Sequence, residues 1–542
     1  MIELSNAGLK QEKEWREKGY KLPQYDREKV RKETERAPFW VHFGAGNIFR
    51  AFQANAAQKL LNTGEIDRGI IAVEGFDYEI IEKMYRPHDN LSILVTLKAD
   101  GTIEKTVVGS IVETRVLDTS DQKEFLRLKE IFAASSLQMI SFTITEKGYR
   151  ITDAEGNTLP QIERDFQAGP EKAVSYLGKV AALLYVRYQA GAHPVAMVSM
   201  DNCSHNGDKL YEAIRAFAEK WEEKGLAAKG FTKYITTKDK VSFPWTMIDK
   251  ITPRPDETVE ELLRKDGIQG IHPVITSRNT YVAPFVNAEE CEYLVIEDAF
   301  PNGREKLEKA GFLFTDRETV DKVERMKVCT CLNPLHTALA VFGCLLGYEK
   351  ISDEMEDEEL RALVYQIGYK EGLPVVTDPG ILNPEEFLDT VLRVRIPNPF
   401  MPDTPQRIAT DTSQKLAIRF GETIKAYLAS SEQDVLNLHM LPFVFAGWLR
   451  YLMAVDDEGR QFTLSSDPLL DVLCPYLSKI VFGGEKSEEK VEETIRPILK
   501  NQEIFGVDLY QAGLSGQVCR YFCEMIKGPG AVRAALKKYV RP

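Results

Sequence analysis

The sequence predicts an α/β domain built on a parallel sheet, followed by an all-helical domain. Short apolar runs alternate with amphipathic stretches over the first half of the chain, which is the rhythm of strands joined by crossover helices. Beyond about residue 315 the strand signals largely stop, and the remaining patterns have helical spacing. Because 542 residues are about three times a typical domain length, two or more domains are expected. We place the boundary between residues 1–315 and 316–542.

The elements of the first half can be assigned in order. Leu91–Leu97 and Thr102–Val108 flank Ala-Asp-Gly and alternate in polarity, which predicts a β-hairpin. Gly191 fits the position that ends a preceding helix. The other predicted strands are Phe39–Phe43, Gly69–Val73, Met139–Ile144 and Val195–Met200, and the predicted helices are Ile48–Leu61, Tyr78–Met84 and Glu171–Ala190.

The second half is predicted to be helical throughout. Its apolar residues recur at helical spacing in stretches separated by polar or proline-containing segments. The predicted helices are Pro334–Leu346, Asp353–Ile367, Pro384–Leu392, Thr412–Leu428, Asp434–Met453, Pro468–Ile480, Glu488–Leu499 and Gly530–Tyr539.

Composition narrows the classes of function. The net charge of −13, with basic residues interleaved with acids, argues against a nucleic-acid partner. The N-terminal residues lack the apolar core of a secretion signal, and the longest apolar runs, Thr337–Leu346 and Met440–Leu449, are about half of the ~20 residues that cross a bilayer. The eight cysteines form no CxxC pair, so neither a disulfide framework nor a zinc site is expected. We therefore expect a cytoplasmic protein with a small-molecule partner; the sequence leaves open whether it is a monomer or a homo-oligomer.

A glycine-rich turn follows the first predicted strand. Gly44 permits a tight turn, and Gly46 lets the backbone approach a pyrophosphate at a helix N-terminus. Phe49 stands where a third small residue is usual. Arg50 lies in the first turn of the helix, where it could meet a phosphate. The turn therefore indicates a dinucleotide-binding site.

An acid closes the second predicted strand. Glu74 lies 28 residues after Gly46. A carboxylate there accepts hydrogen bonds from both ribose hydroxyls and repels a 2′-phosphate, which favours NAD over NADP. The alternative for Glu74 is a solvated strand end.

A second group of polar residues begins the helical half. Asn333 and Pro334 are expected as the N-cap and first residue of a helix, which places His336 in its first turn. With Lys327 nearby, the group could supply one proton-transfer side chain and two hydrogen bonds to a carbonyl oxygen. The alternative is a structural histidine, and we assign the other six histidines to such roles.

Five segments, in order along the chain, resemble the long-chain polyol-specific dehydrogenases, also called the mannitol dehydrogenase family. They span about residues 25–420. The segments are the loop His42–Arg50, Ser141–Tyr149 (SFTITEKGY), Ser199–Asn202 followed by Asn206 and Gly207, Phe243–Pro253 (FPWTMIDKITP), and Ile296–Arg304 (IEDAFPNGR) together with the Lys, Asn and His cluster.

The resemblance implies a doubly wound Rossmann N-terminal domain with extensions, a multi-helical C-terminal domain, and metal-free hydride transfer between NAD and a secondary alcohol or ketone. The catalytic residues that it implies are Lys327, Asn333, His336 and Asn202. The implied substrate-binding residues are Arg407, Lys415 and Asp249, of which Asp249 has a structural role as its alternative. The expected cofactor-binding residues are Gly44, Gly46, Asn47, Ile48, Phe49, Arg50, Glu74, Thr145 and Glu146.

The chain departs from the family between Lys327 and Asn333, where five residues stand in place of the family's four. On an uninterrupted α-helix, one residue rotates the lysine by ~100° relative to His336. Either a π-bulge absorbs the extra residue, or the lysine precedes a break at Asn333 and Pro334.

The resemblance leaves the sugar open. Two cations eight residues apart, Arg407 and Lys415, suit a carboxylate, and the chain is longer than we expect for the mannitol enzymes. We therefore expect a hexuronate, reduced as fructuronate to mannonate. Mannitol 2-dehydrogenase activity is the alternative, followed by tagaturonate reductase activity. A non-catalytic NAD-binding redox sensor would have lost the Lys, Asn and His set, and all three residues are present.

Overall fold

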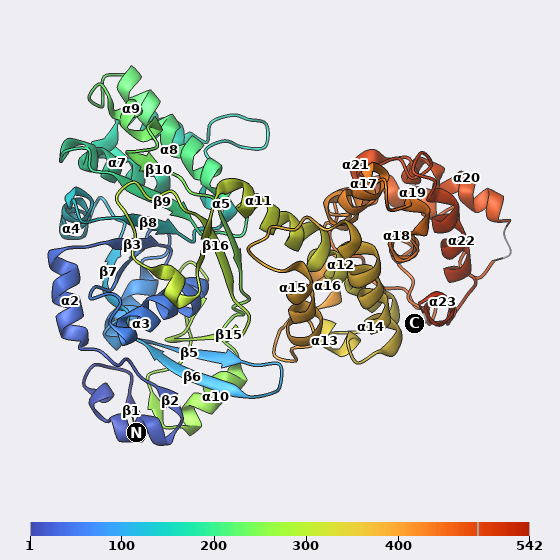
Figure 1. Ribbon diagram of the computed structural model, residues 1–542, viewed down its shortest axis with the longest axis horizontal. Helices are drawn as coiled ribbons and strands as arrows, with labels where there is room; N and C mark the ends of the chain where they lie inside the picture. The colour runs from blue at the N-terminus through green and yellow to red at the C-terminus, as the bar shows by residue number, and fades with distance from the viewer. Residues whose placement is uncertain (1, 485–486, 541–542) are drawn as a thin grey trace. The chain divides into compact units, whose positions relative to one another are not determined.

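The computed structural model describes residues 2–484 and 487–540. The chain divides into two compact units, the first ending at Asp321 and the second beginning at Lys322. The strands that Figure 1 labels belong to the first unit, as does β17 (Leu313–Thr315), the last strand of the described residues. The predicted order, an α/β fold and then an all-α fold, is confirmed.

A six-stranded parallel sheet forms the centre of the first unit. Its order is β10-β9-β8-β3-β4-β7. Counted along the chain within this sheet, that is the 3-2-1-4-5-6 order of doubly wound dinucleotide-binding folds, with the switch point between β3 and β8. The strands are β3 (Trp40–Phe43), β4 (Ile70–Glu74), β7 (Ile111–Val116), β8 (Met139–Phe142), β9 (Val195–Ser199) and β10 (Val241–Ser242).

Both faces of this sheet are covered by helices. In β4, Ile70 and Ala72 belong to one apolar cluster, whereas Ile71 and Val73 belong to another. Because both faces are buried, the four predicted strands β3, β4, β8 and β9 are predominantly apolar, whereas the edge strand β7, which was not predicted, carries Glu113 and Arg115. The first cluster includes residues of α2 (Arg27–Arg36) and α3 (Ala54–Thr63), and the second includes residues of α4 (Gln122–Ala133), α7 (Tyr176–Gln189) and α8 (Asn206–Glu223).

Two smaller sheets extend the first unit. The predicted hairpin is confirmed, because β5 and β6 pair antiparallel within a sheet of order β15-β5-β6-β2. A three-stranded sheet has the order β11-β16-β17. Their strands are β2 (Tyr20–Lys21), β5 (Ser92–Leu97), β6 (Ile103–Val108), β11 (Thr246–Asp249), β15 (Phe285–Glu289) and β16 (Tyr293–Glu297).

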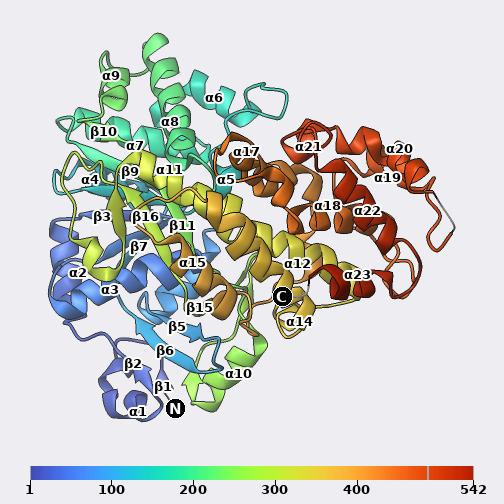
Figure 2. The ribbon, with the colours of Figure 1, turned by 45° about the vertical axis from the view of Figure 1, so that its right-hand side comes forward.

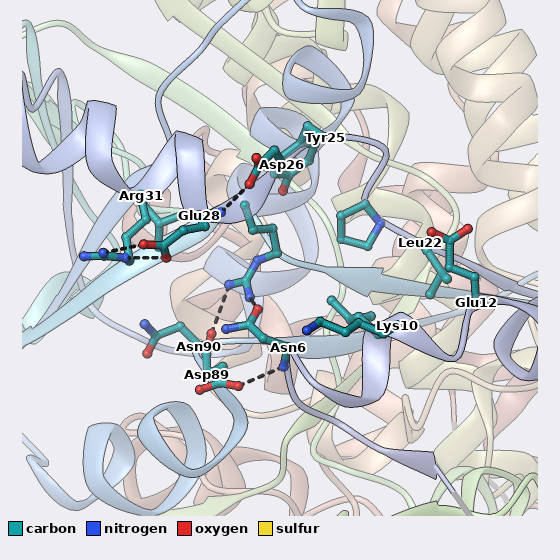
Figure 3. A pocket seen from close by; sticks show the side chains of 14 residues that line it. Asn6, Lys10, Glu12, Leu22, Tyr25, Asp26, Glu28, Arg31, Asp89 and Asn90 are labelled. Carbon is teal, nitrogen blue, oxygen red and sulfur yellow. Dashed lines mark hydrogen bonds and ion pairs between the residues drawn. The ribbon is translucent and has the colours of Figure 1, made fainter.

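The N-terminal residues are fastened to the first unit. Strand β1 (Ile2–Glu3) pairs with β12 (Ile268–Gln269). Arg27 donates to the carbonyl of Gly109 at 2.9 Å and to the side chain of Asn6. A cavity of about 470 Å³ lies beside this contact, and Figure 3 shows interactions among its lining residues, such as Arg31 with Glu28 and the Asn6 backbone N–H with Asp89. This segment therefore extends the sheets and contains none of the predicted site residues.

One predicted helix of the first unit is too long. We expected Glu171–Ala190, whereas α7 begins at Tyr176. Asp165 accepts the backbone N–H groups of Val174 at 2.9 Å and Ser175 at 2.8 Å, and Ser175 Oγ in turn accepts from the N–H of Gly178. The helix therefore begins later than predicted, because the Asp165 carboxylate holds the preceding residues in a turn.

The second unit is helical over the residues that the structure describes. Helix α12 (Asn333–Leu346) contacts α14, α16 and α18, and Figure 2 shows it beside α14 and α18. The helices that follow are α13 (Ile351–Glu354), α14 (Glu358–Tyr365), α15 (Pro384–Thr390), α16 (Pro405–Ile408), α17 (Glu422–Ala429), α18 (Met440–Tyr451), α19 (Leu470–Leu477), α20 (Glu488–Leu499), α21 (Gln502–Phe505), α22 (Ser515–Met525) and α23 (Ala531–Tyr539).

A helical run of 30 residues, Arg317–Leu346, contains α11 (Arg317–Met326), the π-helix η7 (Lys327–Cys331) and α12. In the described part of the chain, it is the single run long and apolar enough to cross a membrane by length and composition. Its most apolar window is 78% buried inside the protein, as expected of a core helix.

Candidate functional site

Gly44 and Gly46 follow β3 at the carboxyl edge of the parallel sheet. Gly44 has φ of +104°, and a Cβ there would lie 2.1 Å from the carbonyl oxygen of Thr143. At Gly46, by contrast, no described atom beyond its chain neighbours lies within 4 Å of the Cβ position. The fold itself therefore requires glycine at residue 44. Residue 46 borders open space, which suits close approach of a diphosphate.

Phe49 fills the position where a small residue is usual. It begins the π-helix η2 (Phe49–Gln53), and its ring stacks on that of His42 with centroids 3.9 Å apart. The His42 ring nitrogens lie 2.7 Å from Ser141 Oγ and 2.9 Å from Thr143 Oγ1. Burial lowers the pKa of His42 to about 3, so the ring is neutral. The aromatic pair thus closes the space between β3 and its helix.

The Arg50 guanidinium is held by other protein groups. It donates to the carbonyl of Ala283 at 2.7 Å and to Asn47 Oδ1 at 2.8 Å. The side chain is only 3% exposed. The phosphate contact of Arg50 stays a prediction; in the structure Arg50 orients Asn47, whose Nδ2 donates to the carbonyl of Pro253 at 3.3 Å. Ile48, beside them, packs against the apolar cluster under the sheet.

Glu74 ends β4 and is buried. One carboxylate oxygen accepts the N–H of Ala45 at 3.0 Å, and the other accepts those of Phe76 at 2.8 Å and Asp77 at 3.1 Å. The alternative prediction, that Glu74 is a solvated strand end, is therefore wrong. The carboxylate joins the turns after β3 and β4. Because a carboxylate has about four lone-pair positions, it can accept one further hydrogen bond from a ligand.

The loop after β8 carries Thr145 and Glu146. Asp201 accepts the N–H groups of Ile144 and Thr145, both at 2.9 Å. Thr145 has φ of +63°, which a non-glycine residue adopts only when its surroundings hold it there. Glu146 is exposed and pairs with Lys209 at 2.5 Å. We did not predict Asp201, although it stands directly before Asn202 in the family-like segment.

Asn202 and Asp249 occupy different sheets of the first unit. Asn202 follows β9 at the carboxyl edge of the parallel sheet and is exposed. Asp249 is the last residue of β11, lies opposite Tyr293 in the antiparallel sheet, and is 6% exposed. The structure thus gathers the cofactor loops and Asn202 along one sheet edge, whereas Asp249 belongs to the extension.

In the second unit, the extra residue after Lys327 is absorbed by a π-turn. The N–H of Leu332 donates to the carbonyl of Lys327 at 3.0 Å, five residues earlier. The π-bulge alternative is therefore correct. Asn333 is the first residue of α12, not its N-cap; Leu332, with φ of −128° and ψ of −62°, is the bend between the π-helix and α12, and its carbonyl accepts the N–H of His336 at 3.2 Å. Lys327 itself is only 3% exposed.

The predicted cations lie on neighbouring segments of the second unit. Arg407 is on α16, exposed, and paired with Asp403. Lys415 donates to the carbonyl of Thr410. Burial lowers the pKa of Lys415, and Arg419 lowers it further. We missed Arg419, although it stands four residues after Lys415, at helical spacing on the same predicted helix.

Arg419 reaches the start of α12. Its guanidinium donates to Thr337 Oγ1 at 2.6 Å, and Thr337 is the neighbour of His336. Thr337 Oγ1 in turn donates to the carbonyl of Asn333 at 2.9 Å. Arg419 is thereby tied to the same helical turn as two of the predicted catalytic residues.

All eight cysteines are free thiols, as expected. Within residues 2–484 and 487–540, no group of three or more His, Cys, Asp or Glu side chains is arranged to hold a metal ion.

Comparison with known proteins identifies the two units by family models. Residues 39–309 match the mannitol dehydrogenase Rossmann domain, and residues 319–525 match the mannitol dehydrogenase C-terminal domain. A D-mannonate oxidoreductase of Thermotoga maritima is 53% identical over 541 residues, which cover 99% of each chain.

Two solved structures resemble the whole chain. A Pseudomonas fluorescens mannitol 2-dehydrogenase in ternary complex with NAD and D-mannitol is 27% identical, with a TM-score of 0.68 and 99% of each chain covered. A substrate-free D-sorbitol dehydrogenase is 25% identical, with a TM-score of 0.74, covering 92% of this chain and 97% of its own.

Proposed function

Because the chain belongs to the mannitol dehydrogenase family, we propose that it reduces D-fructuronate to D-mannonate with NADH. It is an NAD-dependent dehydrogenase that acts on CH–OH groups. The observation that carries the choice of sugar is the 53% identity, over 99% of the chain, with a D-mannonate oxidoreductase. Two cations, Arg407 on α16 and Lys415 on the segment after it, also favour a substrate that carries a carboxylate.

The residues at the carboxyl edge of the parallel sheet fit a dinucleotide. Open space at Gly46 suits the diphosphate, at the N-terminal end of the helix that begins with Asn47. Glu74 retains capacity for a ribose hydroxyl. We assign cofactor contacts to these residues and to Thr145 and Glu146. Bound NAD supplies or accepts the hydride.

The second unit supplies the proton. We assign Lys327 as the group that donates a proton to the carbonyl oxygen in ketone reduction and accepts one in alcohol oxidation. Asn333 and His336 follow on α12, and each would donate a hydrogen bond to the developing alkoxide, as would Asn202. A well-aimed donor of this kind contributes about 3 kcal/mol to transition-state stabilisation.

The remaining assignments concern the substrate. We assign Arg407 and Lys415 to the carboxylate, because a guanidinium binds it through two parallel hydrogen bonds. Asp249 is assigned to a substrate hydroxyl. The cytoplasm as the location of the protein is part of the same proposal.

A substrate panel tests the proposal. NADH consumption would be measured with fructuronate, tagaturonate, fructose and fructose 6-phosphate, and the reverse reaction with mannonate and NAD. We expect the highest kcat/KM with fructuronate. A preference for tagaturonate or fructose would instead identify a tagaturonate reductase or a mannitol 2-dehydrogenase. If none of the four substrates is turned over, the result would favour the alternative, a non-catalytic NAD-binding redox sensor.

A further inference from the structure

We propose that Arg419 binds the substrate carboxylate in addition to the assigned Arg407 and Lys415, and that it selects sugar acids over uncharged polyols. The inference deepens the proposed function and rests on it for the identity of the sugar. It depends on the second unit alone, in which Arg419 lies on the π-helix η12 (Ala417–Gly421).

The first observation is a cation without a counter-charge. Arg407 pairs with Asp403, and Lys415 faces Asp411 and Asp467. In the described part of the chain, no carboxylate pairs with Arg419, whose one side-chain hydrogen bond goes to the neutral hydroxyl of Thr337. A cation held away from water is costly unless an anion compensates it. A substrate carboxylate would provide that charge.

The second observation is that the guanidinium is held in place and yet reachable. It remains partly exposed, although burial lowers its pKa to about 10, a value at which it is still charged near neutrality. One nitrogen is occupied by Thr337 Oγ1. A guanidinium carries five N–H donors in a planar fork, so donors remain for a bidentate carboxylate contact.

The third observation is position. Helix η12 packs against both η7, which carries Lys327, and α12, which carries His336. Thr423, four residues after Arg419, donates to the carbonyl of Cys329 in η7 at 3.2 Å and fastens the two segments together. In fructuronate the carboxylate and the ketone lie toward opposite ends of the carbon chain. The residue that binds the carboxylate must therefore come from a different segment than the proton donor, and Arg419 does.

A structural role is the competing explanation. Through Thr337 Oγ1, Arg419 also supports the carbonyl of Asn333, so its loss could disturb the first turn of α12. Such a disturbance would lower turnover of an acid and of a neutral ketose alike. Only a contact with the carboxylate changes the ratio between them.

The test therefore measures that ratio. The value of kcat/KM for fructuronate would be divided by that for fructose in wild type, Arg419→Met and Thr337→Val. We expect Arg419→Met to lower the ratio at least 100-fold, mainly through KM for fructuronate. We expect Thr337→Val to keep the ratio within threefold. Arg496→Met is the matched control, because Arg496 lies on α20, is exposed, and pairs with Glu492.

Equal loss for both substrates in Arg419→Met would overturn the proposal, as would an unchanged ratio or the same collapse of the ratio in Thr337→Val. Calorimetric titration of the NAD-loaded protein with D-mannonate and D-mannitol separates this inference from the proposed function. If wild type turns over no keto acid, the proposed function fails. A mannonate affinity that Arg419→Met weakens at least tenfold would still support the carboxylate site, and an unchanged affinity would remove it.

Discussion

The backbone N–H of Leu332 donates to the carbonyl oxygen of Lys327 and closes a turn one residue longer than that of an α-helix. A π-bulge is a single-residue insertion in a helix. It can therefore accommodate the one residue by which this chain is longer than its family between Lys327 and Asn333. We infer that the π-turn keeps the lysine, across the bend at Leu332, in the orientation relative to His336 that it would have without the insertion.

A deletion tests this interpretation. Removing Val328 should convert η7 into α-helix and keep the orientation of Lys327 relative to His336, so we expect kcat within roughly tenfold of wild type. Inserting an alanine after Val328 should instead rotate Lys327 by ~100° and abolish turnover. Turnover would be followed by NADH consumption, and folding by the thermal midpoint. Loss of activity in the folded deletion variant would show that the lysine depends on the π-turn itself.

Replacing Lys327 tests its chemical role. Lys327→Ala should lower kcat by roughly 100-fold or more, because general acid–base groups contribute about 10²–10⁴-fold. NADH binding, measured by fluorescence titration, should remain nearly intact. Arg325→Ala is a matched control on the adjoining turn, since Arg325 is exposed and pairs with Glu422 at 3.3 Å. Retention of most of the wild-type kcat in Lys327→Ala would remove the lysine from the mechanism.

The two loop glycines should respond differently to substitution. Gly44→Ala should lower the free energy of unfolding by at least ~2 kcal/mol, since it combines a left-handed backbone with a clash against Thr143. The Cβ of Gly46→Val has no described atom within 4 Å beyond its chain neighbours, so we expect unchanged stability but NADH binding weakened by roughly tenfold or more. Urea unfolding and fluorescence titration of both variants provide the comparison. Undiminished NADH affinity in Gly46→Val would place the diphosphate elsewhere.

Much of the fold followed from periodicity. The hairpin, four of the six parallel strands and helix α20 were predicted within a few residues, because alternation and helical spacing are local signals, whereas the edge strands β7 and β10 were missed. Helix α7 was predicted too long, since its start is set by Asp165 from another segment. Helix α22 was missed, although it packs closely against α18.

The candidate site shows the same division. The glycine turn and the cluster on α12 carry sequence patterns, and these identified the family. The partners of Arg50 and Glu74 depend on contacts between loops that lie far apart in the chain, so the sequence could not show them. The one sequence signal for Arg419 is its helical spacing from Lys415; its missing counter-charge becomes visible only when its neighbours are known.

His42 predicts how stability depends on pH. Its pKa is lowered from 6.5 to about 3 by burial. Below about pH 6.5 the unfolded chain therefore binds a proton that the folded chain does not, and stability falls as the pH is lowered. Its contribution is complete above that pH and declines by ~1.4 kcal/mol per pH unit below it. Between pH 7.5 and pH 5 the loss should be about 2 kcal/mol.

The contribution of His42 is isolated by comparing variants. Carboxylates also titrate in this range, so wild type must be compared with a variant. For wild type and for His42→Gln, the change in unfolding free energy between pH 7.5 and pH 5 is measured, and the second change is subtracted from the first. We expect a difference of about 2 kcal/mol, because glutamine has no proton to gain. Phe49→Leu removes the stacked ring but keeps the imidazole, so it should retain most of the wild-type pH dependence. Equal pH dependence in wild type and His42→Gln would mean that the folded protein admits the imidazolium, and that the contacts with Ser141 and Thr143 do not hold the ring neutral.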